Sequence, residues 1–156
     1  MPLSIGETAP DFSLFDTNKK IVTLSSFRGK TVVLLFFPLA FSSICTKEMC
    51  EMGSEYAYYE EMNAEIIAVS VDSLYTNKKF KEINQLGFTL LSDFNKEVAE
   101  IYDVLDNNFA FGYRGVSKRA SFVIDPAGII VFAEVLPSPG DYTDMSQLKQ
   151  TVMNLS

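Results

Sequence analysis

Two apolar runs of strand-forming residues constrain the fold of this chain more than any other feature. Residues 31–37 (TVVLLFF) form a continuous β-branched, aliphatic and aromatic stretch, which is typical of a strand buried on both faces. Residues 65–71 (EIIAVSV) form a second such run. Between the two runs, the apolar residues recur every three or four positions and so share one helical face, namely Met49, Met52, Tyr56 and Tyr59. The order strand, helix, strand predicts a βαβ unit.

Patterns on both sides extend this unit. The sequence Asp-Pro-Ala-Gly at 125–128 separates two apolar runs and is typical of a hairpin turn, with proline second and glycine last. The strands expected outside this unit are a hairpin of residues 12–15 and 21–24, an edge strand over 88–91, and hairpin strands over 121–124 and 129–133. The expected helices are one over 74–86, a short one over 95–102, and a last one from Thr143 or Asp144. We expect the helix over 74–86 to be capped by Asp72 or Ser73 and ended by Gly87. This order predicts a thioredoxin-like α/β fold, in which helices flank a central mixed β-sheet that also carries an N-terminal β-hairpin. Because no repeat or linker interrupts the order, we expect residues 1–156 to form one domain.

Composition excludes several classes of function. The formal net charge is −7, from 13 basic and 20 acidic residues, and no cationic stripe is visible, so no nucleic-acid partner is expected. The chain has no histidine, which excludes Ser-His and Cys-His pairs, and two thiols with scattered carboxylates make a poor metal site. We therefore expect neither a metal nor another cofactor. Residues 1–7 lack the pattern of a secretory leader and no run reaches the roughly 18 apolar residues of a membrane span, so we expect a soluble, cytoplasmic protein with no membrane partner.

The two cysteines lie where a helix follows the first buried strand. Cys45 falls in the first turn of that helix, where backbone N–H groups favour a thiolate, so it is a candidate nucleophile. Cys50 is too close in sequence for a disulfide that would stabilise the fold much. Pro38 ends the strand and is placed to shield a thiolate, while the Ser42 hydroxyl can accept from a substrate or donate to the thiolate. Glu48, one turn after Cys45, either orients a cation or lies on the surface.

The stretch Pro38-x-x-x-Ser42-x-x-Cys45-x-x-Glu48 resembles the active-site signature of the peroxiredoxins, Pro-x-x-x-Thr/Ser-x-x-Cys. Residues 119–125 (RASFVID) resemble the family segment whose leading arginine completes the site, and the similarity covers nearly the whole chain. The strand and the following Phe-Pro-Leu-Ala-Phe are most similar to the alkyl hydroperoxide reductase E type. The spacing from Cys45 to the next cysteine instead resembles the bacterioferritin-comigratory, or Q-type, group.

The resemblance implies a thiol-dependent peroxidase that reduces hydrogen peroxide and organic hydroperoxides. Cys45 would be the peroxidatic cysteine, oxidised to a sulfenic acid, with Arg119 as its charge partner beside Pro38 and Ser42. Cys50 would resolve Cys45 as an intramolecular disulfide, reduced by thioredoxin or a low-molecular-weight thiol. Two other hypotheses stay open: a thiol–disulfide oxidoreductase of the same fold, which usually carries Cys-x-x-Cys, and a non-enzymatic redox sensor.

Several assignments have competing interpretations at this point. Cys50 is either the resolving cysteine or a buried structural thiol, and Lys118 or Arg114 compete with Arg119 on spacing alone. Helical positions five apart have Cα atoms roughly 8–9 Å apart, beyond the ~7 Å that a disulfide allows, so resolution by Cys50 requires the helix to unwind locally. The aromatic loop at 107–113 (NNFAFGY) forms either a lid over the core or a homodimer contact.

Overall fold

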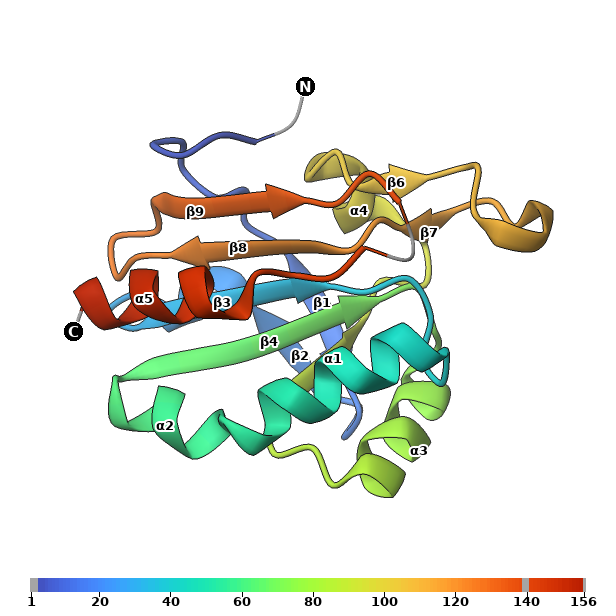
Figure 1. Cartoon of the computed structure of the whole chain (residues 1–156), viewed down its shortest axis with the longest axis horizontal. Coiled ribbons are helices and arrows are strands. Elements are labelled where there is room, and N and C mark those ends of the chain that lie inside the picture. Colours follow the sequence, from blue (N-terminus) through green and yellow to red (C-terminus); the bar gives the residue numbers. More distant parts are fainter. Residues whose placement is uncertain (1–2, 139–140, 156) are drawn as a thin grey trace.

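The computed structural model describes residues 3–138 and 141–155 of the chain (Figure 1). Residues 1 and 2, the first of the segment 1–7 that is expected to carry no leader, lie outside the described residues. Helices cover both faces of a central sheet, as Figure 1 shows, and within the described residues no helix combines the length and apolar character needed to cross a bilayer.

A seven-stranded mixed sheet forms the centre, in the order β2-β1-β5-β4-β3-β8-β9. Its strands are β1 (Ser13–Asp16), β2 (Ile21–Thr23), β3 (Thr31–Phe36), β4 (Ala64–Ser70), β5 (Thr89–Ser92), β8 (Ala120–Ile124) and β9 (Ile130–Val135). Strands β3, β4 and β5 run parallel, while β8 and β1 add antiparallel hairpins on either side. A separate ladder pairs β6 (Leu105–Asp106) with β7 (Val116–Ser117). The predicted βαβ unit, mixed sheet and both hairpins are confirmed.

The helices arise where apolar residues recur with helical spacing. They are α1 (Ser43–Ser54), α2 (Tyr56–Glu61), α3 (Leu74–Asn84), α4 (Glu97–Ile101) and α5 (Met145–Leu155), with 3-10 turns η1 (Leu24–Phe27) and η2 (Ala110–Gly112). The Ser73 hydroxyl caps α3 by accepting from the Thr76 N–H at 3.2 Å. Asp144 similarly accepts from the Gln147 N–H at 3.2 Å at the start of α5. The predicted cap of α3 is confirmed, and α5 begins at Met145, directly after the predicted start at Thr143 or Asp144.

Strand β3 is buried on both faces, as its unbroken apolar run predicts. Val33 and Leu35 belong to one core with Met49 of α1 and Leu148 of α5. The alternate β3 residues belong to a second core on the opposite face, together with Tyr102 beyond α4. Cys45 lies in the first core, so its environment is set by the packing of α1 on the sheet.

Three details differ from the sequence-based expectations. The single helix expected between β3 and β4 is two helices, divided at Glu55. Helix α3 ends at Gln85, which adopts the left-handed conformation at φ 53°, and not at Gly87. A Cβ on Gly87 would lie 2.9 Å from the Tyr56 ring, so this glycine makes room for the ring. Strand β5 is internal and not an edge strand, because β1 pairs with its outer side.

Candidate active site

A short loop carries the chain from β3 to Cys45. Pro38 is buried just beyond the end of β3, and Phe41 takes a left-handed φ of 71° that turns the chain toward α1. A bulky residue with positive φ is strained, so the loop must be held by its surroundings. Asp72, after β4, accepts a hydrogen bond of 2.8 Å from the Ala40 N–H, and the Phe41 ring packs edge-on against Phe80 at 5.1 Å. These contacts fix the path by which Cys45 enters the core.

The register of β8 on β3 brings Arg119 to Cys45. Phe36, the last residue of β3, pairs with Ala120 of antiparallel β8, so Arg119 lies just beyond the carboxyl end of β3. Both terminal nitrogens of Arg119 donate to the Cys45 Sγ at 3.4 Å. The thiol has no exposed surface and the arginine is 2% exposed. In a site so dry, a fixed guanidinium is a strong stabiliser of a sulfur anion.

Of the three cations that competed for this position, the structure selects Arg119. Arg114 is exposed, and Lys118 is half-buried with its backbone N–H bonded to the Val104 carbonyl at 2.6 Å. The sequence alone does not separate these three because the choice depends on the strand register.

Glu48 is fully buried and orients Arg119, so its interpretation as a surface carboxylate is wrong. Its Oε1 accepts from Arg119 Nη1 at 3.1 Å, and its Oε2 accepts from the Thr143 hydroxyl at 2.8 Å. Burial raises the pKa of Glu48, and the Arg119 charge and the Thr143 hydrogen bond limit that rise by favouring the ionised form. A second hydroxyl, from Ser121 of β8, lies 3.3 Å from that of Thr143. The chain Cys45–Arg119–Glu48–Thr143 thus links α1 to the residue just before β8 and to the segment just before α5.

The sequence-based expectations missed Thr143 and Ser121 as members of the site, and Asp72 as the anchor of its loop. Ser121 carried a usable signal, because it is a polar residue within a strand whose other residues are apolar. Thr143 and Asp72 resembled ordinary helix-capping residues, and nothing local marked their distant partners.

Ser42 lies at the N-cap of α1, but its side chain does not donate to Cys45 in this structure. Its hydroxyl donates to the Leu39 carbonyl at 2.9 Å, which leaves the oxygen lone pairs as acceptors. Of the two roles considered for this hydroxyl, accepting from a bound peroxide fits the observed bond.

Cys50 lies on the exposed side of the same helix. Its thiol donates to the Asn84 side-chain carbonyl of α3 at 3.5 Å. The alternative of a buried structural thiol is therefore wrong. The two cysteines are reduced and occupy different faces of an unbroken helical segment of α1.

The aromatic loop before β7 is not a lid over the core. Phe111 is 90% exposed and Tyr113 53% exposed, and their rings contact each other in a tilted arrangement with centroids 6.0 Å apart. The interpretation of this loop as a homodimer contact stays a prediction.

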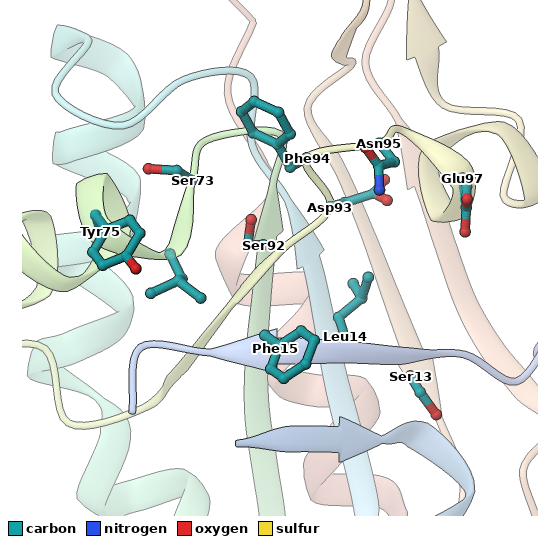
Figure 2. Close-up of a pocket in the computed structure, with 11 residues that line it drawn as sticks. Ser13, Leu14, Phe15, Ser73, Tyr75, Ser92, Asp93, Phe94, Asn95 and Glu97 are labelled. Atoms are coloured by element: carbon teal, nitrogen blue, oxygen red, sulfur yellow. The ribbon is translucent and has the colours of Figure 1, made fainter. Parts of the chain in front are cut away.

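A cavity of about 410 Å³ opens elsewhere, between β1, the start of α3 and the loop after β5 (Figure 2). Figure 2 shows Phe15, Tyr75 and Phe94 around it, and Asp93 is also among the lining residues. Asp93 has a structural role, because its carboxylate caps α4 by accepting from the Val98 and Ala99 N–H groups at 3.1 and 2.8 Å. The cavity contains neither cysteine, so the chemistry of the site lies outside it.

Within the described residues, no three side chains of His, Cys, Asp or Glu converge as metal ligands. What the arrangement offers is a buried sulfur, two guanidinium donors aimed at it and a carboxylate that orients those donors. Such a group of residues suits nucleophilic attack by a thiolate.

Comparison with known proteins agrees with this chemistry. Residues 5–133 match the AhpC/TSA family model. The chain is 39% identical to alkyl hydroperoxide reductase E of Mycobacterium tuberculosis over 145 residues, 91% of each chain. It is 38% identical to peroxiredoxin Bcp of Bacillus subtilis over 133 residues, 84% of each chain. The structure of peroxidoxin BcpB from M. tuberculosis superposes with a TM-score of 0.83 at 27% identity, covering 98% of this chain and 96% of that one. The fold shared with a solved peroxidoxin and the family match of the sequence agree. The chain therefore belongs to the AhpC/TSA family and is a peroxiredoxin, a thiol-dependent peroxidase.

Proposed function

We propose that Cys45 is the peroxidatic cysteine of this enzyme and that Arg119 is its charge partner. The observation that carries the proposal is the pair of 3.4 Å contacts from both Arg119 terminal nitrogens to the buried Sγ. A guanidinium held in this way stabilises the thiolate, which is the reactive form of the residue. Glu48 positions Arg119 and does not itself touch the substrate.

In the proposed reaction, the Cys45 thiolate attacks one oxygen of the peroxide. The S–O bond forms as the O–O bond breaks, and the leaving oxygen departs as hydroxide or alkoxide and is protonated to water or alcohol. Arg119 is close enough to donate to the leaving oxygen as negative charge develops there. The Ser42 oxygen, whose hydrogen is donated to Leu39, accepts from the incoming peroxide hydroxyl. Since Cys45 has no exposed surface, side chains around it must move to admit peroxide, which favours small hydroperoxides.

The residue roles are tested by stopped-flow oxidation of the reduced protein with hydrogen peroxide and with cumene hydroperoxide. We expect Cys45→Ser to abolish the fast reaction and Cys50→Ser to keep it. Fast oxidation of Cys45→Ser would overturn the assignment of the peroxidatic cysteine.

We propose further that Cys50 resolves the sulfenic acid as an intramolecular disulfide. Its exposed thiol reaches Cys45 only if α1 unwinds, because positions five apart on a helix lie roughly 8–9 Å apart at Cα. Hydrogen exchange over residues 43–52 is therefore expected to speed up after oxidation by one equivalent of peroxide. Unchanged exchange in a protein shown by mass to be oxidised would contradict local unfolding.

The remaining features of the cycle are also proposals. An external thiol, either thioredoxin or a low-molecular-weight thiol, reduces the disulfide, and the cytoplasm is the compartment that maintains such reductants. Residues 1–156 act as a single domain. The exposed Phe111 and Tyr113 form a homodimer contact, which light scattering of the wild type and of Phe111→Ser would test: a monomeric wild type would overturn it.

A further inference from the structure

A second groove, of about 400 Å³, lies between the turn that follows β1 and the second half of α3. Residues of both segments line it, namely Thr17, Asn18, Lys78, Lys81, Glu82, Gln85 and Leu86. Its volume falls in the range of small-molecule sites, which is roughly 300–1,000 Å³. The lining holds two lysines and one glutamate, Glu82, which pairs with Lys79 at 3.9 Å, so its net charge is positive.

The surroundings of the groove are more basic than the rest of the chain. Five of the 13 basic residues fall in two short segments at its edges, although the net charge of the protein is −7. These five are Lys19, Lys20, Lys78, Lys79 and Lys81. Among residues 3–138 and 141–155, only one of these five lysines forms an ion pair within 4.0 Å. This is Lys79, whose Nζ lies 3.9 Å from a carboxylate oxygen of Glu82.

The acidic residue at the start of the turn does not neutralise this charge through an ion pair. Asp16 instead accepts from the backbone N–H groups of Asn18 and Lys20 at 2.8 and 3.0 Å. Lys19 lies over the Tyr75 ring at 5.5 Å, which holds this turn against α3. The groove therefore presents ammonium groups whose charge is available to an anionic ligand.

The groove shares a helical turn with the partner of Cys50. Lys81 and Gln85 line the groove, and Asn84, between them in sequence, accepts the hydrogen bond from the Cys50 thiol at 3.5 Å. A ligand held by this turn of α3 is close to the exposed cysteine. Neither Cys45 nor Arg119 lines the groove, so the site is separate from the one that takes peroxide.

We propose that this groove binds the reductant and that the reductant is a small thiol carrying carboxylates. The inference rests on the proposed function, since it assumes a disulfide between Cys45 and Cys50. The thiolate of the bound reductant attacks the Cys50 sulfur, the Cys45–Cys50 bond breaks, and Cys45 leaves as a thiolate beside Arg119. A second reductant thiolate attacks the sulfur of the first, releasing a symmetric disulfide and the Cys50 thiolate. Two protons are taken up where the thiols re-form, and each turn of the cycle oxidises two small thiols.

The binding step is tested with S-methylglutathione, which keeps both carboxylates of glutathione but has no free thiol. Isothermal titration of the reduced wild type is expected to give saturable binding that weakens at high salt. In Lys78→Gln/Lys81→Gln the affinity should fall about tenfold, as loss of two exposed charge contacts predicts. The control Lys96→Gln/Lys149→Gln makes the same change in net charge away from the groove and should bind as the wild type does. No binding by the wild type, or an equal loss in the control, would overturn the proposal.

The reduction step is tested on protein oxidised by one equivalent of hydrogen peroxide. Glutathione should reduce the wild type faster than glutathione diethyl ester does, and this preference should fall about tenfold in Lys78→Gln/Lys81→Gln. Equal rates for the acid and the ester would overturn the groove proposal while leaving the peroxide reaction intact. Failure of peroxide to oxidise Cys45 would instead contradict the proposed function, and the S-methylglutathione titration would still decide whether the groove binds.

Discussion

Asp72 offers a direct test of how the loop before Cys45 is held. Its Oδ2 accepts from the Ala40 N–H and from the Ser70 hydroxyl, both at 2.8 Å. Hydrogen bonds to a charged group are each worth about 1.5–3 kcal/mol, with less expected where solvent reaches the carboxylate. Because Asp72 is half-buried, we expect Asp72→Ala to lower the free energy of unfolding by about 2 kcal/mol.

The same substitution should slow the reaction with peroxide. The bond to Ala40 holds the loop that sets the position of Cys45, and a barrier raised by about 1.4 kcal/mol slows a reaction about tenfold. Urea denaturation gives the stability, and stopped-flow oxidation with hydrogen peroxide gives the rate constant.

A matched control separates loop placement from general destabilisation. Ser73→Ala removes the neighbouring cap of α3, worth about 1 kcal/mol, without touching the loop before Cys45. We expect Ser73→Ala to lose stability but to keep the wild-type rate. An Asp72→Ala protein that reacts as fast as Ser73→Ala would refute the assignment of Asp72 as a positioning residue.

The raised pKa of Asp72 makes the free energy of unfolding depend on pH. Burial raises the pKa of Asp72 above its ordinary value of 3.8, so the folded state binds a proton more tightly than the unfolded state does. The stability contributed by this proton is present below pH 3.8 and is lost as pH rises through the folded-state pKa. Asp72→Asn should therefore show a weaker fall in stability with rising pH than the wild type over that window. Identical pH profiles would contradict the raised pKa.

Three further substitutions test the site itself. Arg119→Gln should slow oxidation by hydrogen peroxide by about 100-fold, because it removes the charged donors aimed at the sulfur, and an unchanged stopped-flow rate would contradict its role. Thr143→Val should lower the free energy of unfolding by about 1–3 kcal/mol, because one oxygen of buried Glu48 loses its donor; unchanged urea denaturation would argue against that bond. Ser42→Thr keeps the hydroxyl and restricts its χ1, so it should react as fast as or faster than the wild type, whereas a large loss of rate would show that the role of Ser42 is misassigned.

Local patterns predicted much of the fold because their causes are local. The unbroken apolar run of β3 requires burial on both faces, and the turn at 125–128 carries proline and glycine where a hairpin needs them. The end of α3 was mispredicted because Gln85 adopts the left-handed conformation that usually favours glycine. The nearby Gly87 serves packing against Tyr56, a tertiary effect that no local pattern reveals.

The site was predictable only in part, for a similar reason. Cys45 and Ser42 lie within one short motif, so their proximity follows from the start of a helix. The contact of Arg119 with Cys45 spans 74 residues and depends on the register of β8 on β3. The bond from Thr143 to Glu48 spans 95 residues and closes only when the start of α5 reaches α1. Sequence spacing does not specify such contacts, whereas the strand pairing does.

The most direct measurement is the intact mass of the wild type and of Cys50→Ser after one equivalent of hydrogen peroxide. The account predicts that the wild type loses two hydrogens as a disulfide forms between Cys45 and Cys50. It predicts that Cys50→Ser gains one oxygen as a sulfenic acid, which a dimedone adduct on Cys45 identifies. A wild type that stops at the sulfenic acid would contradict resolution by Cys50, and the absence of any oxidation at Cys45 would contradict the central claim.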